Sequence, residues 1–184
     1  INIFGNNVTR ESVIRNQIEI DEGDPFNEIL YAKSINNIKS LNFFENVTGE
    51  ILDGKNFNSK IINLNIIEKA TGEIFAGVGT GTDGSSFSFG IKENNYLGRG
   101  VKVDSNLNVS DERIKGRLAV SNPNYKNSDK NLDLALEATS IDRLGTSGYK
   151  SNVTGFSIGT QFEYFNDFRF GLSTKNTFEK ISVD

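Results

Sequence analysis

Apolar and polar residues alternate through most of the second half of the chain. Residues 74–82 alternate modest apolar side chains with glycines, and residues 87–91 alternate phenylalanine and isoleucine with serine and glycine. A period of two residues is typical of a strand with one apolar and one polar face. With a tight turn expected at residues 82–85, the pattern predicts an antiparallel hairpin.

The same alternation recurs in five further segments, at residues 101–109, 114–120, 132–138, 153–164 and 168–174. Charged and amide side chains occupy the opposite faces of these strands. About seven such strands in a row predict a sheet whose apolar face meets lipid. The residues expected to face lipid are Phe87, Phe89, Ile91, Leu132, Leu134, Leu136, Phe156, Ile158, Phe162, Phe168 and Phe170.

A soluble β-sandwich produces the same alternation, because its two apolar faces pack against each other. Two features favour a membrane barrel over this alternative. The predicted strands approach the roughly 9–11 residues of a spanning β-strand, and they follow one another as simple up-and-down hairpins.

The first half of the chain follows a different pattern, with the switch near residues 69–72. A short strand at residues 1–5 precedes a helix that Thr9 is expected to cap, and Asn27 is expected to cap a second helix. Strands follow at residues 47–52 and 60–68. The predicted order is β-α-α-β-β, and a small sheet covered by two helices packs these elements most simply.

Composition narrows the possible functions of the protein. The chain has 184 residues, a net charge of -4 and no Cys, His or Trp. Thiol nucleophiles, serine–histidine triads and the usual zinc sites are therefore excluded within this sequence. Basic residues are outnumbered and form no run, which is not typical of nucleic-acid binding. We expect a protein that is not an enzyme and uses no cofactor or metal.

Two motifs have an ordinary structural interpretation. Residues 79–84 match the G-x-G-x-x-G spacing of a dinucleotide site, but that site needs a helix near its glycines, and a strand pattern begins here instead. Asp21, Glu22 and Asp24 lack the spacing of an EF-hand calcium loop, so a solvated turn between helices explains them.

The glycines of residues 74–82 allow two interpretations. They are small residues on the inner face of a strand, or they weaken a strand whose edge must open, since glycine offers no side chain to fix the register. As the candidate edge for pairing with another chain, this strand comprises Ile74, Phe75, Ala76, Gly77, Val78, Gly79, Thr80, Gly81 and Thr82.

Three segments carry a resemblance to a known family. Residues 3–6 read Ile-Phe-Gly-Asn, residues 41–47 read Leu-Asn-Phe-Phe-Glu-Asn-Val, and residues 94–100 read Asn-Asn-Tyr-Leu-Gly-Arg-Gly. With Asn122-Pro123 at a turn, this order resembles the BamA family of outer-membrane β-barrel assembly insertases. The resemblance implies a POTRA domain at residues 1–69 and the N-terminal part of an outer-membrane β-barrel at residues 70–184.

The resemblance implies that the protein folds and inserts β-barrel proteins into the bacterial outer membrane, with the POTRA domain in the periplasm. Its expected partners are unfolded outer-membrane clients, periplasmic accessory lipoproteins and outer-membrane lipid. A two-partner secretion transporter or a TamA-like translocation factor is the alternative within the family. From another class, the soluble β-sandwich binding module is the alternative.

Two departures from the family pattern lead to further expectations. Asn42 stands where the family usually has glycine, and we expect it to adopt a positive φ, which Asn tolerates better than most residues. The family's Arg-Gly-Phe loop and terminal aromatic strand are not in this sequence, so we expect the chain to be part of a longer protein. With the POTRA domain in the periplasm, parity would place residues 95–98 and 124–128 inside and residues 83–84 and 145–148 outside.

Overall fold

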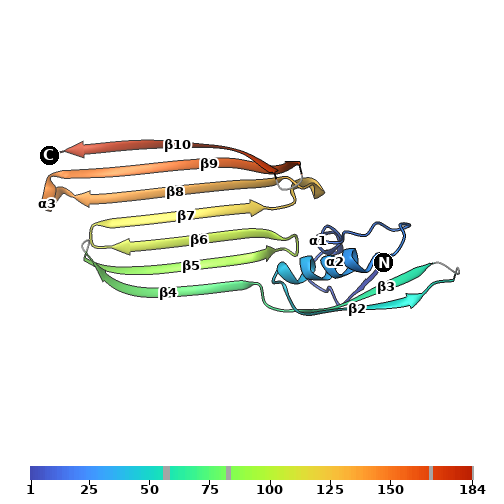
Figure 1. Cartoon of the computed structure of the whole chain (residues 1–184). Coiled ribbons are helices and arrows are strands. Elements are labelled where there is room, and N and C mark those ends of the chain that lie inside the picture. The colour runs from blue at the N-terminus through green and yellow to red at the C-terminus, as the bar shows by residue number, and fades with distance from the viewer. Residues whose placement is uncertain (56–58, 82–83, 166–167, 184) are drawn as a thin grey trace. The chain divides into compact units, whose positions relative to one another are not determined.

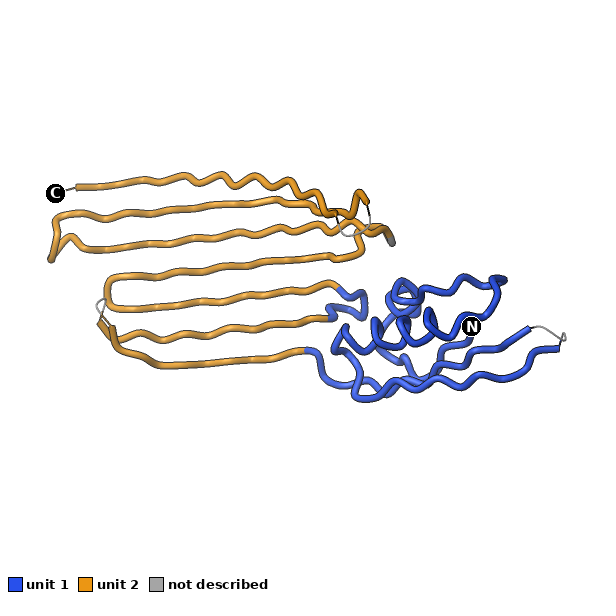
Figure 2. The backbone as a smooth tube through the Cα atoms, in the orientation of Figure 1, with its two compact units in different colours: residues 1–71, 95–100 blue, residues 72–94, 101–184 orange. Residues whose placement is uncertain are grey.

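The computed structural model describes residues 1–55, 59–81, 84–165 and 168–183. The chain divides into two compact units (Figure 2). Unit 1 comprises Ile1–Thr71 together with Asn95–Gly100, and unit 2 comprises Gly72–Asn94 and Val101–Asp184. The turn at residues 95–100 therefore belongs to the N-terminal unit, although residues 72–94 of unit 2 precede it in the sequence.

Unit 1 has the predicted β-α-α-β-β order. Its sheet runs β1-β3-β2, with β1 parallel and β2 antiparallel to the central strand β3 (Figure 1). The described elements are β1 (Asn2–Phe4), α1 (Glu11–Arg15), α2 (Glu28–Ser40), β2 (Phe44–Asp53) and β3 (Lys60–Glu68).

The core of unit 1 follows from the alternation along β3. Ile62, Leu64 and Ile66 are buried, whereas the intervening positions stay outside the core. The two helices supply Ile14 and Ile38, both fully buried. Phe43, Phe44 and Val47 complete this side of the sheet, so both phenylalanines of the 41–47 motif belong to the core.

The structure confirms one predicted helix cap and corrects the other. Asn27 caps α2, because its side chain accepts hydrogen bonds from the backbone N–H groups of Ile29 and Leu30. The prediction for Thr9 was wrong, since α1 begins at Glu11 and no side chain caps it. The Thr9 hydroxyl is instead used in a tertiary contact.

Asn42 has the expected left-handed backbone, with a φ of 59°. Its side-chain oxygen accepts a hydrogen bond of 2.6 Å from the Lys69 ammonium. Asn42 thus adopts the left-handed backbone conformation at the turn from α2 to β2, where the related family usually has glycine.

Unit 2 is a single seven-stranded antiparallel sheet in the order β10-β9-β8-β7-β6-β5-β4 (Figure 1). All seven predicted strands are present, and several are longer than the alternating segments indicated. They are β4 (Gly72–Gly81), β5 (Gly84–Tyr96), β6 (Val101–Ser110), β7 (Arg113–Asn122), β8 (Asn131–Arg143), β9 (Tyr149–Phe165) and β10 (Phe168–Val183).

Short helical turns connect some of these strands. The 3-10 turn η1 (Tyr125–Asn127) precedes β8, and α3 (Leu144–Ser147) joins β8 to β9. The predicted turn at residues 82–85 lies partly outside the described residues. None of the helices in the described part of the chain has the length and hydropathy needed to cross a membrane.

Candidate functional site

The candidate edge strand is β4, the first strand of unit 2. It pairs with β5, placing Ile74 opposite Ile91 and Val78 opposite Phe87. Among the described residues β4 has no second partner strand, and all ten of its residues are exposed, Val78 to 87%. Thr82, the last residue of the predicted edge, lies outside the described residues. One side of the β4 backbone is therefore open within this sheet.

The two halves of β4 differ in their packing. A Cβ added at Gly77 or Gly81 would meet no atom within 4 Å, and one at Gly79 would approach only the Ser86 hydroxyl at 3.3 Å. In the other half, the Phe75 ring lies over Gly90, where a Cβ would come within 2.1 Å of the ring. Side-chain packing against β5 is thus concentrated in the first half of the strand.

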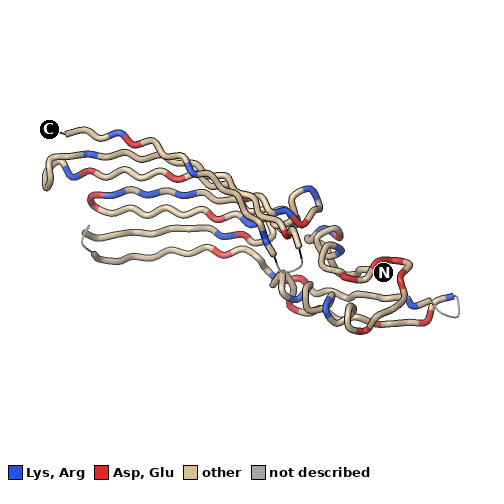
Figure 3. The backbone as a smooth tube through the Cα atoms, turned by 45° about the horizontal axis from the view of Figure 1, so that its top comes forward, with Lys and Arg blue, Asp and Glu red and all other residues tan. Residues whose placement is uncertain are grey.

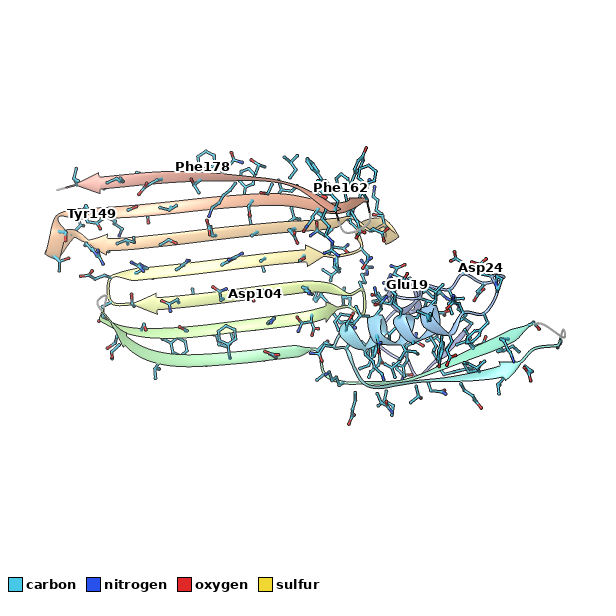
Figure 4. The ribbon with its side chains drawn as sticks, viewed as in Figure 1. Glu19, Asp24, Asp104, Tyr149, Phe162 and Phe178 are labelled. Carbon is cyan, nitrogen blue, oxygen red and sulfur yellow. The ribbon has the colours of Figure 1, made fainter. Side chains whose placement is uncertain are left out.

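Ten of the eleven residues predicted to face lipid share one face of the sheet, and Phe168 lies opposite Phe165 at an irregularity in the register. The register places Leu134 beside Val120 and Ile158, and Leu136 beside Leu118 and Phe156. Phe162 and Phe170 lie on this face with their rings 5.7 Å apart (Figure 4). Most of the set is exposed, because no described element of unit 2 covers this face. Contact with lipid stays a prediction.

The opposite face carries most of the charges of unit 2, although Asp142 and Lys150 pair with each other near the strand ends on the register of the apolar face. Arg113, Lys115 and Arg117 follow one another along β7 (Figure 3). Across β8, β9 and β10, Glu137 pairs with Lys175, and the Ser151 hydroxyl donates a hydrogen bond of 2.8 Å to Glu179. These contacts between strands stabilise the polar face.

A buried hydrogen-bond network joins three separate segments of unit 1. The Asn95 side-chain amide N–H donates to the Thr9 hydroxyl at 2.8 Å, and the Asn95 side-chain oxygen Oδ1 accepts from the Gly100 backbone N–H at 2.7 Å. Glu68 accepts from the backbone N–H groups of Val8 and Thr9 at 2.8 and 2.6 Å. Sequence reasoning did not find this network; the closely spaced Asn95, Gly98 and Gly100 were its only signal.

Burial and hydrogen bonding act in opposite directions on the pKa of Glu68. Burial alone raises this pKa, but the hydrogen bonds from the Thr9 side chain and from the backbone of residues 7–9 outweigh burial. The pKa of Glu68 therefore lies below its usual value. The carboxylate is held in its charged form at the end of β3.

The described residues contain no group of three or more acidic side chains placed to hold a metal ion. Glu22, one of the three acidic residues near the helix junction, instead accepts a hydrogen bond of 3.0 Å from Arg15. The G-x-G-x-x-G spacing runs from the end of β4 to the start of β5, with no helix at its last glycine. A pyrophosphate site of the dinucleotide type is therefore not formed here.

Comparison with known proteins identifies the architecture. The POTRA family model, described as a surface antigen variable number repeat, matches residues 1–69. The structure of BamA from Haemophilus ducreyi lacking POTRA domains 1-3 matches 98% of this chain at 24% identity, with a TM-score of 0.82.

CdiB from Acinetobacter baumannii and CdiB from Escherichia coli each match 98% of the chain at 13% identity, with TM-scores of 0.60 and 0.65. The chain spans 35% of the BamA chain and 37% of each CdiB chain. These comparisons confirm the family resemblance and the fold class predicted from the sequence. Residues 1–69 are a POTRA domain, and the chain as a whole has the BamA fold, in which that domain is followed by the antiparallel strands of a partial barrel.

Proposed function

We propose that this protein folds and inserts other β-barrel proteins into the bacterial outer membrane, and that β4 is the strand on which a client strand pairs. One observation carries the proposal: β4 has a single partner strand in the described chain and is exposed along its whole length. The fold shared with BamA supports the same function.

The driving force is the cost of unpaired backbone groups in lipid. Each N–H or C=O group without a hydrogen bond in the bilayer core costs several kcal/mol. A client strand that pairs with β4 satisfies the groups of both strands at once. Because pairing uses the backbone, one edge serves clients of different sequence, and the small residues of β4 do not obstruct their approach.

In this proposal each part of the chain has its own environment. The apolar face of unit 2 contacts outer-membrane lipid, and the POTRA domain lies in the periplasm. Within the described residues β2 pairs only with β3, so its free edge is available to extended clients or periplasmic accessory lipoproteins by strand addition. The protein is proposed to act without enzymatic chemistry.

The second candidate function is the transport of a narrower set of substrates, as in two-partner secretion or TamA-like translocation. The likeness to the two CdiB structures supports this candidate, because they share the same fold. The two functions differ in their clients. Reconstituted protein that inserts several unrelated barrels supports the insertase, and protein that acts on one substrate alone supports the transporter.

A proline scan through residues 75–81 tests the role of the β4 backbone. Proline donates no hydrogen bond and is excluded from the interior of paired strands. Successive N–H groups point to opposite sides of a strand. Proline where the N–H faces the open edge should therefore abolish client insertion, and the severity should alternate from residue to residue.

The matched controls are alanine variants at the same positions, such as Val78→Ala, which keep the N–H group and should retain most activity. Folding of each variant is checked by its heat-modified migration in gels. Normal insertion by every folded proline variant would show that this edge does not template clients.

A further inference from the structure

The hydrogen-bond network of unit 1 connects the two ends of the β4–β5 hairpin. Glu68 is the last residue of β3, just before β4 begins at Gly72, and Asn95 lies at the end of β5. Both side chains bond to Thr9: Glu68 to its backbone N–H, and Asn95 to its hydroxyl. Thr9 therefore joins the chain entering the hairpin to the chain leaving it.

This junction is closely packed. Thr9 is 2% exposed and Asn95 is 4% exposed, so the hydrogen bond between them joins two buried polar side chains, and removing one side of it is costly. The Arg10 N–H donates to the Gly98 carbonyl at 2.8 Å. Gly98 lies so close to the backbone of Val8 that a Cβ would come within 1.9 Å of the Val8 carbonyl oxygen.

The backbone of the turn suits this close approach. Leu97, Gly98 and Gly100 have φ values of 54°, 68° and 66°. Glycine adopts such conformations at little cost, and at Gly98 a side chain would also collide with the backbone of Val8. The backbone conformation of the Asn95–Gly100 turn therefore allows it to pack closely against residues 8–10.

The two halves of β4 also differ in side-chain packing. The first half of the strand carries the Phe75 ring over Gly90. The second half carries Gly77 and Gly81, whose Cα atoms have open space where a side chain would stand. Segments with few side-chain contacts open locally at lower free energy than packed segments.

We propose that Thr9 is a latch for the base of the β4–β5 hairpin, so that β4 separates from β5 starting at the Gly81 end while its Gly72 end stays attached. The assignment of β4 as the client-pairing strand rests on the proposed function, but the direction of opening does not.

Hydrogen exchange followed by mass spectrometry tests the latch on the protein in detergent micelles. In the unmodified protein, peptides covering residues 77–81 should exchange at least about tenfold faster than peptides covering residues 72–76. Thr9→Val should raise exchange of residues 72–76 and 95–100 by about tenfold. Exchange of residues 77–81 should change less than about twofold, since this half lies far along the strand from the Thr9 contacts and opens independently of them.

Matched variants separate the latch from general destabilisation. Thr9→Ser keeps the hydroxyl and should restore slow exchange at the base. Thr48→Val makes the same chemical change at an exposed position of β2 and should leave β4 unaffected. Exchange of the α2 amides reports whether unit 1 remains folded. Should Thr9→Val unfold it, Phe75→Leu removes the ring over Gly90 and should raise exchange at residues 72–76.

Uniform exchange along β4 in the unmodified protein would overturn the proposal, as would equal acceleration of both halves by Thr9→Val in a folded unit 1. Client insertion is measured on the same samples. A gradient of hydrogen exchange along β4 without any insertion activity would refute the proposed function and leave the latch unaffected. Insertion activity together with uniform hydrogen exchange along β4 would refute only the latch.

Discussion

The two sheets of this protein follow the same alternation of apolar and polar residues but differ in what lies on their apolar faces. In unit 1 the inward side chains of β3 pack under α1 and α2, and the core is closed. In unit 2 the corresponding face has no covering element among the described residues, and Leu136 in its middle is 57% exposed.

This difference teaches that a period of two residues specifies a strand and its faces but not the medium that the apolar face meets. Packed protein and lipid both accept Leu, Ile and Phe. They respond differently to mutation, however, because a protein core retains a cavity where a side chain is removed, whereas fluid lipid refills the space. The following predictions use this contrast.

The largest effect is expected in the closed core. Ile38→Ala should lower the free energy of unfolding of unit 1 by about 2–5 kcal/mol, because it leaves a cavity among fully buried side chains. Leu136→Ala removes a similar side chain from the open face of unit 2 and should cost less, about 1–2 kcal/mol, because the transfer free energy is lost but lipid leaves no cavity. Denaturant unfolding in micelles measures both, with exchange of the α2 and β8 amides as local probes. Equal costs would remove the distinction between the two faces.

The next effect tests whether the open face lies in lipid. Leu134→Arg should destabilise a complete membrane-inserted barrel by about 2–4 kcal/mol if the site is near the bilayer midplane, because the charge must enter hydrocarbon. Gln161→Arg, on the polar face, should be mild. A folding titration into lipid vesicles gives both values. If the two variants tolerate the charge equally, the face assignment is wrong.

Glycines that face aromatic rings give a smaller contrast. At Gly49 a Cβ would lie 2.0 Å from the Tyr31 hydroxyl oxygen, and Tyr31 is packed against the core of unit 1. Gly49→Ala should therefore cost about 1–3 kcal/mol through overpacking. Gly90→Ala meets the Phe75 ring, which is exposed and can swing away, so it should cost less.

Gly77→Ala, with open space at its Cα, is the control for the loss of glycine itself and should change stability least. Thermal unfolding of the three variants ranks them. A cost for Gly77→Ala as large as that for Gly49→Ala would show that backbone effects, not the neighbouring ring, determine the loss.

The smallest predicted effect is a pH dependence confined to unit 1. The pKa of Glu68 is lower in the folded protein than the usual 4.5, so its carboxylate stabilises unit 1 fully above pH 4.5. This stabilisation should fall as the pH drops through the folded pKa. Exchange of the α2 amides should therefore accelerate in this range, and Glu68→Gln should abolish that part of the acceleration. An unchanged pH profile in the Gln variant would assign the effect to other carboxylates.

Local sequence signals anticipated the elements of both units. The alternation in β3 and in the seven strands of unit 2 is a property of neighbouring residues, so it was readable directly. The cap at Asn27 follows from side-chain chemistry within one turn, and the positive φ at Asn42 was expected from the family resemblance, in which glycine usually stands there. The strand ends were less readable, since β8, β9 and β10 extend beyond their alternating apolar segments.

The sequence by itself determined the order of the elements, the two faces of each strand and the absence of Cys and His chemistry, because these depend on residue identity and short spacing. Only the tertiary structure decided the use of Thr9, which a helix cap and a long-range hydrogen bond suit equally well in local terms. Its partner Asn95 is 86 residues away, and no periodicity reports a contact at that separation. The position of Phe75 over Gly90 was settled in the same way, by the register of two strands.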